Sequence, residues 1–192
     1  MKRDFQRSKV YRWAHNYVWP MDYEYLDLKQ CENLIVDVLR VFNFNNTELT
    51  LKPMVANRKY GSFNLGNRVI KISQHGQIRP VVLHEVAHFL NHYYYGRTVP
   101  AHGKEFVGFY MSLLNKWSRI PISELQRTAE INKVQYINPK LMPKLRSKLN
   151  LKPKNSLKNK YIVTKLAKYI PENGIFKLMP GKYSGYQIQY YE

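Results

Sequence analysis

The segment from Val81 to Leu90 carries two histidines and a glutamate in an apolar run, Val-Val-Leu-His-Glu-Val-Ala-His-Phe-Leu. His84 and His88 are four residues apart, so on an α-helix they share one face and can converge on one metal ion. A helix this apolar must be buried, where unpaired His and Glu side chains are costly. If the pattern had arisen by chance, nothing would offset the cost of burying these His and Glu side chains. We therefore favour a metal site on a buried helix.

The residue types in this segment indicate which metal and which chemistry to expect. Neutral imidazole is a good ligand for zinc. Glu85 follows the first histidine directly, where its carboxylate can reach a water on the metal rather than the metal itself. Zinc lowers the pKa of such a water from about 15.7 to near 7, and a carboxylate can pass its proton to a leaving amine. The pattern predicts one Zn²⁺ ion with Glu85 as the catalytic base.

A catalytic zinc needs a third protein ligand and an open fourth position. His92 continues the helical spacing, but it lies two turns from the first histidine, about 12 Å along the axis. The two other candidates, His102 and Glu105, follow in the segment Ala-His-Gly-Lys-Glu-Phe. We prefer His102, because Gly103 permits a tight turn into the next helix. Glu105 is then solvated, or it accepts a hydrogen bond from a ligand.

Helices and short strands are expected around this segment. Apolar residues at helical spacing predict a helix from Tyr23 to Phe42, with Asp22 as its N-cap. β-Branched residues bounded by turn residues predict short strands over 49–51, 59–64 and 68–73. Further helices are predicted over 78–95, 103–117 and 121–131, the last with Ser123 as N-cap.

These elements predict an α+β fold class, a compact domain with a small antiparallel sheet and three to four helices. An extended peptide can pair with an exposed edge strand beside a metal site. The strand over 68–73 is the candidate for that role, although an ordinary sheet edge is an equal alternative. Tyr93, Tyr94, Tyr95 and Tyr110 can be considered as oxyanion donors, but aromatic residues on helices more often belong to the core.

Two motifs at this spacing resemble a known family. His84-Glu-Val-Ala-His88 followed by His102-Gly-Lys-Glu-Phe106 is similar to the SprT-like zinc metallopeptidases, in which His-Glu-x-x-His precedes His-Gly-x-x-Phe. The resemblance extends over residues 23–130. It implies a zincin fold and peptidase activity. Family members include DNA-dependent proteases that degrade proteins crosslinked to DNA.

Those relatives couple the zincin domain to a zinc ribbon or to other DNA-binding segments. This chain has a single cysteine, Cys31, so it has no cysteine ligands for a ribbon. Its basic C-terminal part is then a metal-free replacement or an unrelated segment.

Composition predicts four parts in the chain. Residues 1–22 are a basic, aromatic N-terminal arm that docks on the domain or on a partner. Residues 23–132 form the SprT-like metallopeptidase domain. Residues 133–160, rich in Pro, Lys and Asn, are a basic linker, and residues 161–192 are a small β-rich C-terminal segment with short strands.

The net charge is +18 and is concentrated at the C-terminal end. Residues 133–192 hold 13 Lys and Arg but only two Asp or Glu, a net charge of +11. Such an excess attracts polyanions, most commonly nucleic acid. A solvated linker or a surface for an acidic protein remains the alternative. The side chains predicted to contact DNA phosphates are Lys144, Arg146, Lys148, Lys152, Lys154, Lys158 and Lys160.

The sequence thus predicts a zinc-dependent endopeptidase that acts on proteins at or near nucleic acid. The alternative is a zincin-fold binding or structural protein in a phage or nucleic-acid assembly with little or no proteolysis. Its partners are expected to be a protein or peptide substrate and DNA, with no membrane. No apolar run is long enough for a signal peptide or a membrane span, which predicts a cytoplasmic or virion-associated protein. The many Lys, Asn and Tyr residues suggest an AT-rich genome such as that of a phage. The oligomeric state is left open.

Overall fold

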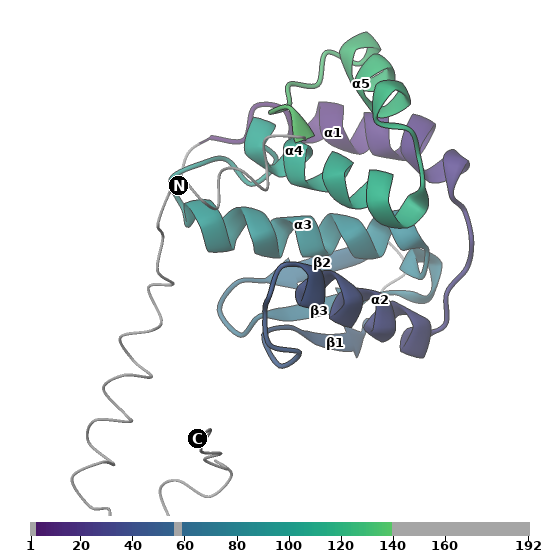
Figure 1. Cartoon of the computed structure of the whole chain (residues 1–192), viewed down its shortest axis with the longest axis vertical. Coiled ribbons are helices and arrows are strands. Elements are labelled where there is room, and N and C mark those ends of the chain that lie inside the picture. Colours follow the sequence, from purple (N-terminus) through teal and green to yellow (C-terminus); the bar gives the residue numbers. More distant parts are fainter. Residues whose placement is uncertain (1–2, 56–58, 140–192) are drawn as a thin grey trace, which may run out of the picture. The chain divides into compact units, whose positions relative to one another are not determined.

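The computed structural model describes residues 3–55 and 59–139, which fold into an α+β arrangement of helices around a small sheet (Figure 1). The fold class is confirmed: residues 23–132, the predicted domain, hold four α-helices, within the three to four expected, and a fifth lies in the predicted N-terminal arm. The helices are α1 (Arg7–Trp13), α2 (Leu28–Val41), α3 (Arg79–Tyr95), α4 (Lys104–Leu113) and α5 (Ile122–Ile131). The strands are β1 (Thr50–Pro53), β2 (Gly61–Asn64) and β3 (Val69–Ile72).

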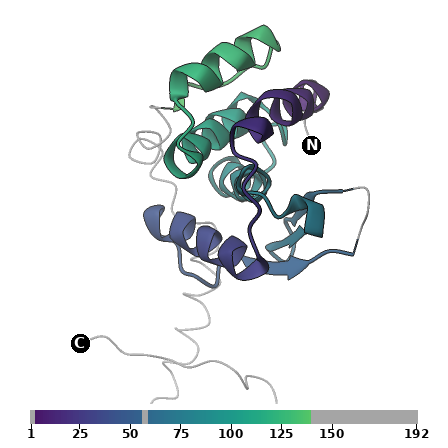
Figure 2. The same cartoon turned by 90° about the vertical axis from the view of Figure 1, so that its right-hand side faces the viewer.

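Helix α3 lies at the centre of this arrangement. The sheet and α2 lie on one side of it and α4 on the other (Figures 1 and 2). Residues from Pro80 to Asn91 are buried, apart from the half-buried His88. Pro80 lies in the first turn, where its missing N–H costs no hydrogen bond. Gly96 ends the helix with a φ of 61°, a conformation that favours glycine. The helix predicted over 78–95 is confirmed.

The sheet is mixed, not antiparallel. Strand β3 lies in the middle, pairing antiparallel with β2 and parallel with β1 in the order β1-β3-β2. The prediction of an antiparallel sheet was therefore wrong for the β1–β3 pair. Strands β2 and β3 form a hairpin, and β1 pairs with the other edge of β3. Strands that are not consecutive in the chain are free to run parallel.

Helix α2 begins later than the apolar pattern predicts. It starts at Leu28, and Asp27 is the N-cap in a capping box with Gln30. The Asp27 carboxylate accepts from the Gln30 N–H at 2.7 Å, and the Gln30 side chain accepts from the Asp27 N–H at 2.8 Å. The predicted Asp22 cap was therefore wrong. Asp22 instead accepts two hydrogen bonds from the Arg79 guanidinium, at 2.7 and 2.9 Å.

Two other helix ends also differ in detail. Helix α5 begins at Ile122 with Pro121 at the capping position, so Ser123 lies inside the helix and is not its N-cap. Helix α4 ends at Leu113, and a π-helical turn continues to Ser118. The helix predicted over 103–117 is thus present over nearly its whole length, but its last turn is π-helical instead of α-helical.

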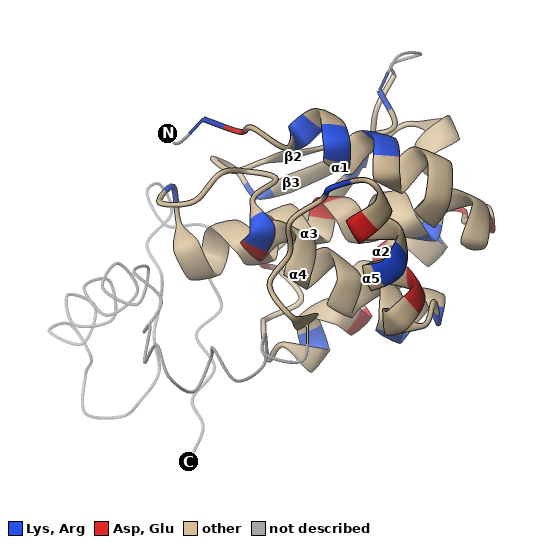
Figure 3. Cartoon of the chain, turned by 90° about the horizontal axis from the view of Figure 1, so that it is seen from above, with Lys and Arg blue, Asp and Glu red and all other residues tan. Residues whose placement is uncertain are grey.

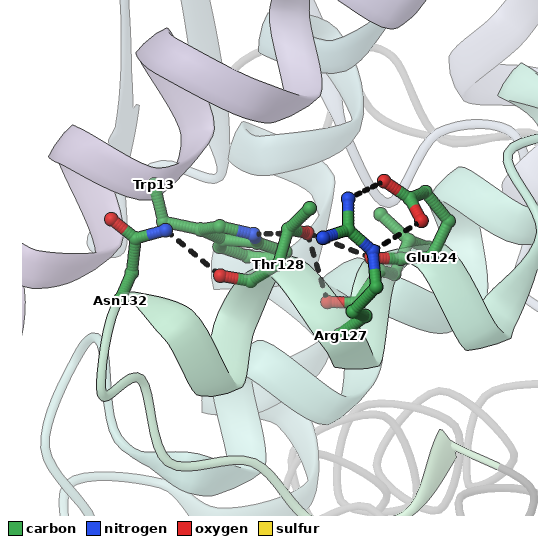
Figure 4. A network of polar contacts seen from close by, with 6 residues as sticks. Trp13, Glu124, Arg127, Thr128 and Asn132 are labelled. Carbon is green, nitrogen blue, oxygen red and sulfur yellow. Dashed lines mark hydrogen bonds and ion pairs between the residues drawn. The ribbon is translucent and has the colours of Figure 1, made fainter.

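The N-terminal segment packs into the core of the domain. Val10 and Trp13 of α1 are completely buried. The Trp13 indole N–H donates a hydrogen bond to Thr128 Oγ1 at 3.0 Å, which ties α1 to α5 (Figure 4). Thr128 in turn donates to the Glu124 carbonyl at 2.8 Å. The described part of the N-terminal arm thus docks on the domain.

The predicted linker and C-terminal strands fall on residues 140–192, outside the described part of the chain apart from the first few linker residues. The four-part division of the chain therefore stays a prediction. Among residues 3–55 and 59–139, no helix has the length and apolar character needed to cross a membrane.

The buried Gly76 gives a direct test of the packing between the turn that follows β3 and the residue that precedes β2. A Cβ at this position would lie 1.8 Å from the Tyr60 carbonyl oxygen. That carbonyl cannot move freely, because it accepts hydrogen bonds from the Ser73 N–H and hydroxyl at 3.0 and 3.1 Å. We expect Gly76→Ala to lower the free energy of unfolding by roughly 1–3 kcal/mol, measured by urea denaturation.

The matched control is Gly66→Ala. Gly66 is exposed, and the nearest atom to an added Cβ is Asn64 Oδ1 at 3.4 Å. This variant should stay close to the wild type. An equal loss of stability in both variants would contradict the role of the close approach at Tyr60.

Candidate metal centre

Three histidines meet between α3 and the start of α4. His84 and His88 lie on one face of α3, with their Nε2 atoms 3.2 Å apart. With His102, which precedes α4, they offer one ligand atom each, all within 4.8 Å of one another. Two imidazole nitrogens bound tetrahedrally to one zinc at about 2.0–2.1 Å would be roughly 3.3 Å apart. The spacing within the His84–His88 pair therefore suits one ion.

The chain brings His102 to this place through a tight turn. The Gly103 N–H donates to the Pro100 carbonyl at 3.1 Å, and α4 begins at the next residue. One turn into α4, the completely buried Phe106 lies against all three imidazoles. Its ring centroid is 4.9 Å from that of His84, 4.4 Å from His88 and 5.0 Å from His102. Phe106 thus provides an apolar surface against which the three imidazole rings pack.

The other two candidates for the third ligand do not belong to the group of described side chains that can share one ion. The His92 ring hydrogen-bonds the Gly96 carbonyl at 3.2 Å, at the far end of α3. Glu105 is half-buried in the first turn of α4. Within the described residues, the group of side chains able to share one ion contains His102 and neither of these two.

Burial keeps the three imidazoles in the form that binds metals. Burial, reinforced by the neighbouring histidines, holds the pKa of His84 and of His88 well below its usual value. Burial also lowers the pKa of His102, although Asp4 opposes this shift. His102 Nε2 is buried and has no hydrogen-bond partner among the described residues. An unpaired buried polar atom costs about 1–3 kcal/mol, and coordination of a metal ion would remove that cost.

Glu85 lies beside the histidines on α3 and is only 5% exposed. Burial raises the pKa of its carboxyl to about 8, and a backbone hydrogen bond with Phe63 of β2 opposes the shift. The space for this side chain depends on Gly61, because a Cβ there would lie 2.9 Å from Glu85 Oε1 and 3.0 Å from its Cγ. Strand β2 therefore fixes the carboxylate from one side.

His84, His88 and Glu85 line a cleft of about 720 Å³ between α1, β2 and α3. Tyr11 of α1 lies over the histidines, stacked on His84 at a centroid distance of 5.5 Å and tilted against His102 at 5.0 Å. Burial, and then the proximity of Glu85, raise the pKa of the Tyr11 hydroxyl. Reasoning from the sequence missed Tyr11, because nothing local in the N-terminal segment indicates that it packs on a site formed by residues 84–102.

The tyrosines considered from the sequence lie elsewhere. Tyr93, Tyr94 and Tyr95 pack against the hydrophobic core. Tyr110 is completely buried, and its hydroxyl donates to the Pro80 carbonyl at 3.1 Å. None of these four residues lines the cleft.

The strand next to the cleft is β2, not the predicted one. The strand predicted over 68–73 is β3, which has a neighbour on each side and so offers no free edge. Strand β2 is an edge strand, and residues 60–63 line the cleft. The Phe63 backbone that contacts Glu85 belongs to this edge. An extended peptide beside the histidines would therefore have to pair with β2.

Two buried histidines and the half-buried His88 lie on and beside one helix, with a carboxylate next to them, and define a candidate mononuclear metal centre in an α+β domain. A sequence model of the SprT-like family matches residues 41–126. The matched segment runs from the end of α2 into α5 and contains all three histidines and Glu85. The match confirms the resemblance of this part of the chain to the SprT-like family. Comparisons with curated proteins and with solved structures gave no match.

The residues predicted to contact DNA stay a prediction. Lys144, Arg146, Lys148, Lys152, Lys154, Lys158 and Lys160 all lie outside the described residues.

Substitution of the candidate third ligand tests the composition of the centre. We expect His102→Ala to lose stoichiometric zinc, because two imidazoles alone do not complete a catalytic zinc site. His92→Ala and Glu105→Ala should keep it, since neither side chain belongs to the group able to share one ion. The measurement is metal content after zinc loading and desalting. Full zinc in His102→Ala together with loss in Glu105→Ala would reverse the assignment.

Proposed function

We propose that the SprT-like domain is a zinc-dependent endopeptidase that acts on proteins at or near nucleic acid. The observation that carries the proposal is the convergence of the three histidines beside the buried Glu85 in a cleft bordered by a free strand edge. His84, His88 and His102 would hold one zinc ion. When bound, zinc would supply Lewis-acid polarisation of a water and of a peptide carbonyl.

Glu85 is suited to move the proton in such a reaction. Burial raises the pKa of its carboxyl above the usual value, which makes the carboxylate a stronger acceptor for a proton from water. Its position between α3 and Gly61 of β2 leaves the carboxylate little freedom, so it is held next to the cleft. The carboxylate would accept a proton from the attacking water and donate it to the leaving amine.

The free edge of β2 is suited to hold the substrate. An extended peptide can add to an exposed edge through backbone hydrogen bonds, with side chains pointing alternately toward and away from the domain. Strand β2 borders the same cleft as His84 and Glu85. A peptide paired there would pass close to the metal ligands, whatever its sequence. This arrangement favours unfolded or loosely folded protein substrates.

The nucleic-acid part of the proposal rests on charge and on the resemblance. Residues 133–192 carry a net charge of +11. Figure 3 shows Lys, Arg, Asp and Glu positions on the described domain, and five of the basic residues there form ion pairs: Lys29, Arg40, Arg68, Arg79 and Arg127. The excess of basic over acidic residues is larger in residues 133–192 than in the rest of the chain, which favours the C-terminal residues as the contact for a phosphate backbone.

The peptidase proposal predicts a specific effect of Glu85→Gln. The variant should bind zinc as the wild type does, because residue 85 is not a ligand. It should cleave an unfolded protein such as casein about 10²- to 10⁴-fold more slowly, because the proton acceptor is gone. Cleavage is measured by gel analysis with and without single-stranded DNA.

Glu105→Gln is the matched control, since it removes a carboxylate that follows His102 closely in sequence but is not in the group able to share one ion. It should cleave at the wild-type rate. A zinc-loaded wild type that cleaves nothing, with or without DNA, would contradict the peptidase proposal and favour a binding role. Cleavage that DNA does not change would contradict only the nucleic-acid part.

The predicted DNA contacts can be tested without proteolysis. Replacing Lys144, Arg146 and Lys148 by Ala should weaken DNA binding and flatten its salt dependence, by about one unit of slope for each phosphate that is no longer neutralised. The matched control replaces three exposed basic residues of the domain, Lys52, Lys71 and Lys104. Binding is measured by fluorescence anisotropy across a salt series. An equal effect of the two triple variants would contradict a specific role for the C-terminal residues.

A further inference from the structure

The N-terminal segment contacts the candidate metal centre from outside the part of the chain that matches the family. In the sequence, Asp4 lies 98 residues before His102 and well before the start of the matched segment, residues 41–126. One oxygen of its carboxylate, Oδ2, lies 2.7 Å from His102 Nδ1 and 3.3 Å from the His102 backbone nitrogen. The Asp4 side chain is only 15% exposed and that of His102 only 6%, so water competes little for this contact.

The direction of the hydrogen bond follows from the groups involved. An ionised carboxylate only accepts, so the His102 ring must carry its proton on Nδ1 and donate it to Asp4. Nε2 then has the free lone pair, and this is the buried His102 atom that has no partner among the described residues. The contact thus selects the tautomer that presents Nε2 to the other two histidines.

Gln6 holds the same segment in place. Its side-chain amide donates to the His102 carbonyl at 2.7 Å and to the Gln135 carbonyl at 3.1 Å. Its side-chain oxygen accepts from the Gln135 N–H at 2.9 Å. Gln6 therefore ties the segment that carries Asp4 directly to the backbone of His102. The same segment continues into α1, which is anchored in the core by the completely buried Val10 and Trp13.

We propose that Asp4 is a positioning residue of the metal centre, which the N-terminal segment completes by orienting the ring of His102. A carboxylate on the outer nitrogen of a ligating imidazole fixes the tautomer and the ring plane and strengthens the ligand; loss of such a partner typically costs 10- to 100-fold in metal affinity. The inference rests on the proposed metal site but not on peptidase activity. It also extends the functional unit about 40 residues before the family match, to the first described residues of the chain.

The test uses the full-length chain and zinc as the probe. The zinc dissociation constant is measured by competition with a chromophoric chelator for the wild type, Asp4→Asn and Asp4→Ala. We expect Asp4→Ala to bind zinc about 10- to 100-fold more weakly. Asp4→Asn keeps the shape and an acceptor but loses the charge, and it should fall between the two. Asp37→Asn is the matched control: Asp37 is an exposed aspartate that pairs with Arg40 on α2.

A second measurement separates positioning from a structural role. In metal-free protein, ¹⁵N NMR of the imidazoles should show His102 with its proton on Nδ1 in the wild type, and a mixture of tautomers in Asp4→Ala. A purely structural role would instead lower the thermal stability of the metal-free protein while the zinc affinity of the remaining folded protein stayed unchanged.

The outcomes distinguish this inference from the proposed function. A wild type that binds no zinc overturns both the metal site and the role of Asp4. A wild type that binds zinc, with Asp4→Ala within about threefold of it, overturns the role of Asp4 alone. Weaker zinc binding in Asp4→Ala and not in Asp37→Asn supports the inference, whether or not the protein cleaves any substrate.

Discussion

The burial of α3 is the constraint on which the rest of the domain depends. This helix is covered by the sheet and α2 on one side and by α4 on the other, so its polar residues are carried into the interior (Figure 1). His84 and Glu85 are 4% and 5% exposed. Polar groups at such positions are destabilising unless they find partners. A shared metal ion would supply a partner for the histidines, and the backbone of β2 supplies one for Glu85.

The neighbours of α3 are arranged so that each completes one part of this interior. Phe106 of α4 lies against the three imidazoles, and Gly61 of β2 leaves the space that Glu85 occupies. Tyr11 of α1 covers the histidines on the cleft side. The centre is therefore built from four segments that are distant in sequence. Its geometry depends on the packing of the whole described domain, and on residues well outside the segment that matches the family.

The sequence was informative where a signal is local. The spacing of His84 and His88, the apolar residues around them and the proline and glycine at the helix ends were enough to predict α3 and the face on which its two histidines lie. The preference for His102 over Glu105 came from a nearby glycine, and the clustering of the histidines supports it. Helix starts were less predictable: Asp22 and Asp27 are both good N-caps, and the choice between them depends on Arg79, a tertiary partner of Asp22.

Contacts between distant segments could not be predicted in this way. The parallel pairing of β1 with β3, the free edge of β2 and the contact of Asp4 with His102 depend on how elements meet in space. No periodicity or local motif encodes them. The sequence of residues 3–12 contains no signal that distinguishes a segment extending into solvent from one that packs over the three histidines.

X-ray absorption at the zinc edge of the zinc-loaded protein tests the central claim most directly. One zinc held by three histidines predicts scattering from three imidazole rings, with zinc–nitrogen distances of about 2.0–2.1 Å and one further light ligand. Two imidazoles or fewer, or a sulfur ligand near 2.3 Å from Cys31, the only cysteine in the chain, would contradict it.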